Sequence, residues 1–349
     1  MAYGIDHIRF KINKEGNRFM VETLKGIILR ETPIGDYDKM MTVLTADGGK
    51  LSVFAKGAKR LKSPLFAATQ LFSYTEMTLK KTGNTYYIRT GDLIENFYHI
   101  RDTLEGAALA GYIADIASDI AIEGQEAVEL MRLVLNSFHL ISTGKKPIAQ
   151  IKAVFELRAA AIAGFMPNLV ACDGCGSSDL EVLYFDVSNG TFRCEECFRA
   201  ASLLTERFAE RRNENEGIYP TGQLISVLSA SVFAAMRYAV YSKPERIFAF
   251  ELKDEALTDF ASVAEKYITC HLEKNYSTLD YSFNSFERFE TDADGVLRHT
   301  VYKKKYRWFL VLACIAFLLN TIFAWMDNHS VPLLVTILEL GTLALNVFT

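Results

Sequence analysis

Two pairs of cysteines are the residues of this sequence whose types and spacing point most clearly to chemistry. Cys172 and Cys175 form one Cys-x-x-Cys pair, and Cys194 and Cys197 form a second pair about twenty residues further on. Four thiolates are the number that a tetrahedral zinc ion needs, and a complete ligand set leaves no open position for water. The spacing therefore predicts a structural zinc ion. Two disulfides, or thiols that are paired by chance, stay open as the alternative.

The stretch between the two cysteine pairs predicts a short β-hairpin. Aliphatic, aromatic and β-branched residues fill 183–187 and 191–193, and the Asn189-Gly190 dipeptide between them is a strong signal for a tight turn. A hairpin that carries a cysteine pair at each base is typical of a zinc ribbon. We therefore expect a zinc-ribbon-like module at residues 170–200.

Length, charge and cysteine usage limit what the rest of the chain can be. The 349 residues are enough for two or three domains with cores of their own. The net charge is only −4, so a surface for nucleic acid has to come from local clustering of cations. Only Cys270 and Cys314 lie outside the zinc set, and the first residues lack the apolar core of a secretory signal. These features predict a cytoplasmic protein.

The first hundred residues indicate a β-domain. Residues 1–19 are polar and aperiodic, and we expect a disordered extension there. A domain at 20–98 follows, in which short runs of β-branched, aromatic and aliphatic residues alternate with glycine-containing turns. Five short strands in fewer than about eighty residues favour a small barrel of the OB type. The predicted strands are 26–30, 40–44, 50–55, 72–79 and 85–90.

The next segment, residues 99–283, indicates a helical domain into which the zinc module is inserted. Apolar residues recur there at the three- and four-residue spacing of amphipathic helices. The overall fold class is therefore multidomain α+β. The predicted helices are 104–120, 128–138, 147–163, 229–241 and 257–274.

The last part of the chain predicts a membrane anchor. A polar linker at 284–307 ends in a basic cluster, and the uncharged apolar run 308–326 is long enough to cross a bilayer. A second apolar stretch follows, so we expect a transmembrane helical hairpin at 308–349. By the positive-inside rule, residues 308–348 would tether the rest of the protein to the inner face of the cytoplasmic membrane. A buried helical pair in a soluble protein, or a fused tail without a role, stays open.

A run of cations without acidic neighbours lies in the predicted barrel. Phe54, Gly57, Ser63 and Phe66 lie between or beside these cations, and a basic loop of this kind can bind phosphates and stack bases. A solvated lysine surface without a partner is the alternative interpretation. The cations are Lys50, Lys56, Lys59, Arg60 and Lys62.

Several short motifs then occur in order, and together they are similar to a known family. They are Leu24-Lys25-Gly26, Gly35-Asp36-Tyr37-Asp38-Lys39, the run from Gly49 to Arg60, Gly164-Phe165-Met166-Pro167-Asn168-Leu169 before the cysteines, and Thr278-Leu279-Asp280. From about residue 20 to residue 283 the chain resembles RecO, a family of bacterial recombination mediators. The resemblance covers about three quarters of the chain, and the apolar tail departs from it.

The resemblance implies a DNA-binding protein that is not an enzyme. It implies that the chain binds single- and double-stranded DNA near the nucleoid, anneals complementary strands, and works with RecR to help RecA replace single-strand-binding protein (SSB). A membrane-anchored zinc-ribbon scaffold that has lost DNA binding is the alternative. The cations that we expect to contact DNA are Lys25, Arg30, Lys39, Lys50, Lys56, Lys59, Arg60 and Lys62.

Overall fold

The computed structural model describes residues 8–12, 18–83, 85–178, 182–201, 225–274 and 276. They all belong to the first of two compact units, residues 1–284 and 285–349. The linker predicted at 284–307 and the transmembrane hairpin predicted at 308–349 lie outside the described residues. Among the residues that the structure describes, no helix is both long and apolar enough to cross a membrane.

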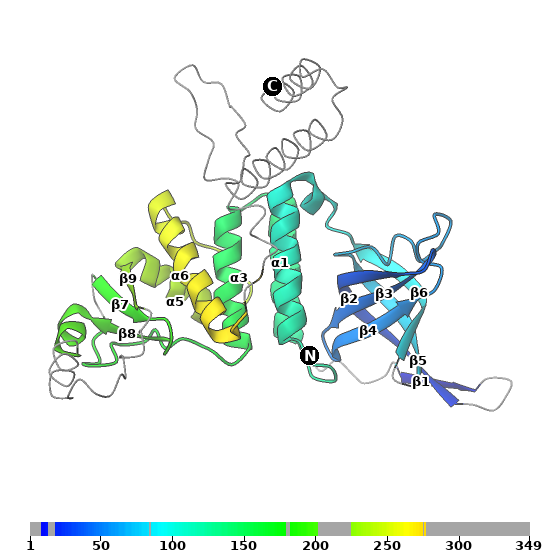
Figure 1. Cartoon of the computed structure of the whole chain (residues 1–349), viewed down its shortest axis with the longest axis horizontal. Helices are drawn as coiled ribbons and strands as arrows, with labels where there is room; N and C mark the ends of the chain where they lie inside the picture. Colours follow the sequence, from blue (N-terminus) through cyan, green and yellow to red (C-terminus); the bar gives the residue numbers. More distant parts are fainter. Residues whose placement is uncertain are drawn as a thin grey trace, which may run out of the picture. The chain divides into compact units, whose positions relative to one another are not determined.

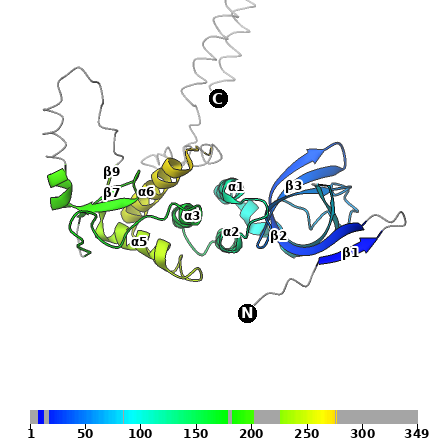
Figure 2. The ribbon, with the colours of Figure 1, turned by 90° about the horizontal axis from the view of Figure 1, so that it is seen from below.

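Five strands close into the barrel that the sequence predicts. The order β2-β3-β4-β6-β5 returns to its start because β5 pairs with β2, and β4 runs parallel to β6. Figure 1 labels these strands, and Figure 2 shows the barrel from below. This Greek-key order is that of an OB-type barrel. The strands are β2 (Arg18–Ile34), β3 (Asp38–Thr45), β4 (Gly49–Ala55), β5 (Tyr74–Thr82) and β6 (Thr85–Glu95).

The N-terminal extension differs from the prediction. Residues Ile8–Ile12 form a strand, β1, that pairs antiparallel with residues 18–22 of β2. The expectation of a disordered segment at 1–19 is therefore wrong for residues 8–12 and for residues 18–19, which begin β2. The sequence of β1 alternates apolar Ile8, Phe10 and Ile12 with two cations, which is a strand period that the overall polarity of the segment conceals.

The helical body is built around one central helix, α3. Buried residues cover nearly the whole of α3, from Gln150 to Ala160, because other helices pack on several of its sides (Figure 1). These helices are α1 (Leu104–Ile120), α2 (Val128–Thr143), α3 (Ile148–Ile162), α5 (Ala230–Tyr241) and α6 (Asp254–Leu272), and a short 3-10 helix, η1 (Tyr98–Asp102), precedes them. The five helices predicted from the apolar spacing are thus confirmed, with ends that differ by a few residues.

The cysteine-rich segment forms a small sheet that shares a core with the helices. β7 (Val182–Asp186) and β8 (Thr191–Cys194) make the predicted hairpin, and Gly190 in its turn has a φ of 64°. A third strand that the sequence did not predict, β9 (Ile225–Ser229), pairs with the other edge of β7. Phe185 and Phe192 are fully buried and belong to the same apolar cluster as α3. The module is therefore part of the helical body's core.

Candidate metal centre and nucleic-acid interface

The four predicted ligands converge at one end of the β7–β8 hairpin. Cys172 and Cys175 lie in the turns before β7, Cys194 ends β8, and Cys197 follows in the helical residues 195–201. Their sulfur atoms all lie within 4.8 Å of one another, and the Cys175 and Cys194 sulfurs are 3.8 Å apart. All four are free thiols, so the disulfide alternative does not hold. The site is compatible with one zinc ion.

Backbone amides prepare the cluster for negative charge. The amides of Gly174 and Cys194 donate to the Cys172 sulfur at 3.4 and 3.3 Å, and the Cys197 amide donates to the Cys194 sulfur at 3.4 Å. Burial raises the pKa of Cys172, but hydrogen bonds from the Cys194, Cys175 and Gly174 amides outweigh it and bring the pKa down to about 6. A Cβ atom at position 174 would lie 2.8 Å from the Cys197 sulfur, so the turn requires glycine.

The pKa values of the other thiols show that the cluster needs a cation to hold several thiolates at once. Hydrogen bonding to the Cys194 and Cys175 sulfurs, together with burial, raises the pKa of Cys197 to about 12, and the pKa of Cys175 is also raised. Four sulfur atoms this close cannot all ionise without a positive charge between them. A divalent metal supplies that charge and holds thiolates deprotonated, so the cluster has the chemistry of a metal-binding site.

Two tyrosines hold the chain that leads into the cysteines. The Tyr241 hydroxyl donates to the Pro167 carbonyl at 3.0 Å and accepts from the Leu169 amide at 3.0 Å. The Tyr267 hydroxyl donates to the Phe165 carbonyl at 3.1 Å. The segment 164–169 is thereby fixed to α5 and α6. It leads directly to the first cysteine pair, so these bonds also fix the side from which Cys172 and Cys175 reach the cluster.

His271 lies beside the cysteine-rich module, where it contacts a carbonyl and an aromatic ring. Its Nε2 atom is 3.1 Å from the Val187 carbonyl, and its ring stacks on Phe165 with ring centroids 5.0 Å apart. Burial lowers its pKa, which favours the neutral ring that packs against these neighbours. The side chain joins α6 to the turn after β7.

The structure separates the eight cations that we expected to contact DNA into two groups. Three of them have partners within the protein: Arg30 pairs with Asp115 at 2.7 Å, Lys39 pairs with Glu31 at 2.7 Å, and the Lys50 ammonium donates to the Ser118 carbonyl at 2.6 Å. Lys39 is also buried, with only 6% of its side chain exposed. Arg30 and Lys50 join the barrel to α1, while Lys39 is held within the barrel. Arg30 stays exposed in spite of its ion pair. The other five cations are all exposed: Lys25, Lys56, Lys59, Arg60 and Lys62.

Four of these exposed cations lie together in one loop, and the fifth lies elsewhere. Residues 56–62, which we call the basic loop, follow β4 directly, at the end of the barrel where β2 turns into β3. Lys25 lies near the opposite end of the β2–β3 pair, beside the register position where Gly26 meets Thr45. The structure therefore brings Lys56, Lys59, Arg60 and Lys62 together and leaves Lys25 apart.

The turn at residues 35–37 fixes the conformation of the basic loop. The Gly57 amide donates to the Asp38 carboxylate at 2.7 Å, and the Lys59 amide donates to the Tyr37 carbonyl at 2.9 Å. The Arg60 guanidinium lies 4.6 Å from the centre of the Tyr37 ring. Since Tyr37 is 52% exposed, a cation and an aromatic face are presented side by side.

A second aromatic pair lies on the outer face of the barrel next to the basic loop. Phe54 on β4 and Tyr87 on β6 meet edge to face with ring centroids 5.6 Å apart, and Tyr87 is 37% exposed. Arg89 is exposed at a bulge, because the β5–β6 register passes from Thr78–Thr90 to Leu79–Ile88. Sequence reasoning did not single out Tyr37 and Tyr87 as binding candidates, although the pairing of β4 with β6 places Tyr87 beside the cations.

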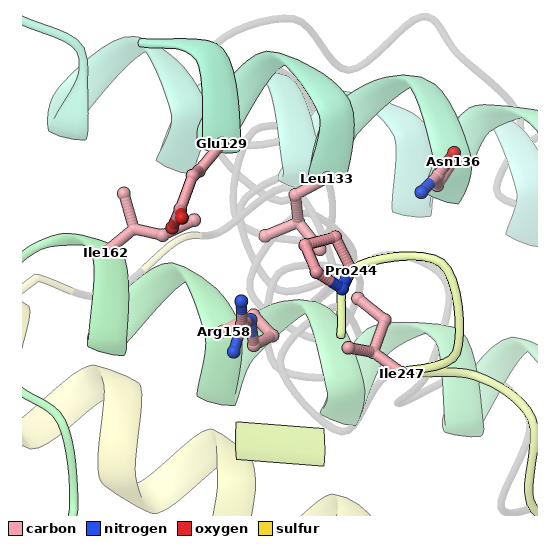
Figure 3. Close-up of a pocket in the computed structure, with 7 residues that line it drawn as sticks. All are labelled: Glu129, Leu133, Asn136, Arg158, Ile162, Pro244 and Ile247. Carbon is pink, nitrogen blue, oxygen red and sulfur yellow. The ribbon is translucent and has the colours of Figure 1, made fainter. Parts of the chain in front are cut away.

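Two cavities lie in the helical body, away from the basic loop. The smaller, about 10 Å³, is lined by Glu129 and Leu133 of α2, Arg158 of α3, and Pro244 and Ile247 after α5 (Figure 3). That volume suits about one water molecule and no substrate. A larger open groove of about 510 Å³ lies along the ends of α1, α3 and α6.

The chain matches two family models and several curated proteins. The model for the Recombination protein O N terminal matches residues 20–97, and the model for the Recombination protein O C terminal matches residues 101–212. A DNA repair protein RecO from Acetivibrio thermocellus is 34% identical over 256 residues, which are 73% of this chain and 94% of that protein. One from Alkaliphilus metalliredigens is 26% identical over 262 residues, or 75% of this chain and 98% of that protein. The matched segments contain both the barrel and the four cysteines.

Proposed function

Since the chain belongs to the RecO family of DNA repair proteins, we propose that it acts in recombinational repair by binding DNA on its barrel and annealing complementary strands. In this proposal it works with RecR and helps RecA to replace SSB on single-stranded DNA. It contributes binding surfaces and no catalytic step. The zinc set at Cys172, Cys175, Cys194 and Cys197 has a structural task.

One observation carries the proposal: four exposed cations share the basic loop, and no acidic residue stands among them. Within the described chain, no hydrogen bond or ion pair occupies the side chains of Lys56 and Lys62. Among the described residues, the Lys59 ammonium has one hydrogen-bond partner, the Gly35 carbonyl at 3.3 Å. Cations that are free of internal partners can neutralise phosphates and release the counterions around DNA.

The chemistry of annealing fits such a loop. Two complementary strands repel each other through their phosphates, and the repulsion is the barrier that a mediator has to lower. A surface that neutralises both backbones lowers that barrier without forming or breaking a covalent bond. The exposed rings of Tyr37 and Tyr87 beside the cations can stack on unpaired bases, which favours single strands over a closed duplex.

The test is the salt dependence of single-stranded DNA binding by the full chain, compared with its Lys56→Glu/Lys59→Glu/Arg60→Glu variant. We expect the variant to lose at least about tenfold in affinity and its log–log salt slope to fall by about 2, since each lost phosphate contact removes about 0.7 for a single strand. The annealing rate of complementary oligonucleotides should fall with it.

A matched control carries the same change of charge elsewhere. Lys145, Lys243 and Lys266 are exposed on the helical body, and their triple change to Glu alters the net charge equally. We expect this control to keep most of its affinity. If the zinc-loaded wild type does not bind DNA at low salt, or if both triple variants lose affinity equally, the proposal is wrong.

A further inference from the structure

The tip of the basic loop carries a leucine that the protein does not bury. Leu61 is 86% exposed, more than any other large apolar side chain in the described chain. An isolated exposed leucine is common on protein surfaces and by itself means little. Its neighbours set Leu61 apart, because Arg60 precedes it and Lys62 follows it in the sequence.

The loop holds Leu61 outward in a defined position. The Ser63 amide donates to the Arg60 carbonyl at 2.9 Å, so Leu61 and Lys62 are the two central residues of a hydrogen-bonded turn. The turn is anchored on both sides by residues in the barrel's own core: Ala58, fully buried, and Leu65, 8% exposed. The backbone at Leu61 therefore loses little conformational freedom when the side chain meets a partner.

The charges around Leu61 identify the partner's chemistry. A protein partner with an apolar pocket would have to accept cations on both sides of the leucine, whereas a nucleic-acid strand offers phosphates for the cations and base faces between them. Arg60, stacked on the exposed Tyr37 ring, extends the same arrangement of positive charge and flat apolar surface.

We propose that Leu61 is an apolar wedge that packs against an unstacked base, and that it directs the protein to places where DNA stacking is interrupted. Such places are the junctions between single- and double-stranded DNA and the ends of paired segments. A wedge enters there without separating stacked bases, while in a continuous duplex it must first open a base step. The inference rests on the proposed function, since it needs the basic loop to bind DNA.

The experiment measures the affinity of the full chain for three fluorescent DNAs of one length: single-stranded, duplex, and a duplex with a single-stranded overhang. Leu61→Ala is compared with Leu104→Ala, which truncates a 68% exposed leucine on α1. We expect L61A to lose about tenfold in affinity for the junction DNA and to change little on the duplex. Its salt slope should equal that of the wild type, because no phosphate contact is lost.

Two further measurements keep the inference separate from the proposed function. A 2-aminopurine base at the junction should change its fluorescence on binding of the wild type and of Leu61→Phe, and less on binding of L61A. Suppose that the wild type binds DNA, that the Lys56/Lys59/Arg60 variant does not, and that L61A has the same affinity as L104A for all three DNAs. The proposal that Leu61 is a wedge is then wrong, while the proposal that the basic loop binds DNA is kept. If the wild type binds none of the three DNAs, both proposals fail.

Discussion

Glu156 on α3 is a charged side chain inside an apolar helical body. It has no solvent exposure, and its Oε1 atom accepts from the Tyr112 hydroxyl at 2.5 Å and from the Lys152 ammonium at 2.7 Å. Its Oε2 atom has no hydrogen-bond partner in the described chain. Lys152 also pairs with Glu265 at 2.9 Å. Burial raises the pKa of Glu156 to about 7, although Lys152 and Tyr112 act in the opposite direction.

The raised pKa predicts a pH-dependent stability. The pKa of Glu156 is 4.5 in the unfolded state and about 7 in the native state. At a pH between these two values, the native state holds a proton on Glu156 that the unfolded state has lost. The free energy of unfolding therefore falls as the pH rises through this window. Glu156→Gln should remove this contribution, and the wild type should lose stability relative to the variant by at most about 1.4 kcal/mol per pH unit. The measurement is urea unfolding of both proteins from pH 5 to pH 8.

Glu265→Gln is the control for Glu156→Gln. Glu265 contacts the same lysine, but its side chain is 61% exposed. Its charge is the smallest of the causes that act on the pKa of Glu156, so the change should lower that pKa slightly and keep most of the pH dependence of the wild type. Parallel pH profiles of the wild type and Glu156→Gln would contradict the assignment of a raised pKa to Glu156.

At the scale of single residues, the sequence could predict that the four cysteines come together. It could not predict which cations have partners inside the protein. The cysteine spacing is local, and two Cys-x-x-Cys pairs about twenty residues apart are typical of a zinc site. Arg30 and Lys50 find their partners on α1, at Asp115 and Ser118, which only the fold brings near. A list of basic residues therefore contains the DNA-binding candidates and also the cations that join the barrel to the helices.

At the scale of elements, the turn between β3 and β4 decides how the barrel meets the helices. The Gly124 amide donates to the Gly48 carbonyl at 3.0 Å, and the Ala127 amide donates to the Ala46 carbonyl at 2.7 Å. Gly49 in this turn has a φ of 63°, and a Cβ atom there would lie 2.0 Å from the Ile122 carbonyl oxygen. Both the backbone conformation and the close approach require glycine.

Gly49→Ala should therefore destabilise the protein more than a glycine change that alters conformation alone. We expect a loss of at least about 3 kcal/mol, since backbone strain adds to a clash that only a shift of the 122–125 loop can relieve. Gly83→Ala is the control: its φ is 59° and nothing lies within 4 Å of a Cβ there, so the loss should be about 1–2 kcal/mol. Denaturant unfolding measures both, and equal losses would show that the contact at Ile122 does not matter.

The elements that the sequence predicted correctly are those whose pattern is complete within one segment. The five barrel strands and five helices carry their own alternation or helical spacing, and their turns contain glycine. β9 lacks such a local pattern, because it forms a strand by pairing with β7, which precedes it by some forty residues. The bulge at Leu29, where the β2–β3 register passes from Ile28 to Arg30, also depends on the partner strand.

At the scale of the described unit, the buried apolar residues form two separate cores. One lies inside the barrel and contains Met41, Val53 and Met77. The other joins the helices, the metal module and one side of the barrel, so Phe185 beside the cysteines and Leu29 on the bulge belong to the same cluster. A disturbance at the cysteines should therefore spread through the helices before it reaches the barrel interior.

If the four cysteines hold the proposed zinc ion, its removal should destabilise the helical body and leave the barrel folded. Cys194 is buried, and the strand that it ends carries Phe192 into the helical core, so loss of its ligand bond releases apolar contacts as well as the metal. We expect Cys194→Ser, or chelation of the wild type, to lower the unfolding temperature and the hydrogen-exchange protection of β8 and α5. The amides of Val53 and Met77 should keep their protection, and the basic loop its affinity for DNA.

Cys270→Ser provides the comparison, because Cys270 is a half-buried free thiol on α6 outside the cluster. It should bind one zinc per chain and unfold as the wild type does. Uniform loss of protection in Cys194→Ser, with the barrel amides included, would show that the two cores unfold together and that the barrel depends on the metal. Because the proposed DNA-binding loop is anchored at Ala58 and Leu65 in the barrel's own core, zinc-free protein that still binds DNA would assign the two tasks to separate parts of one chain.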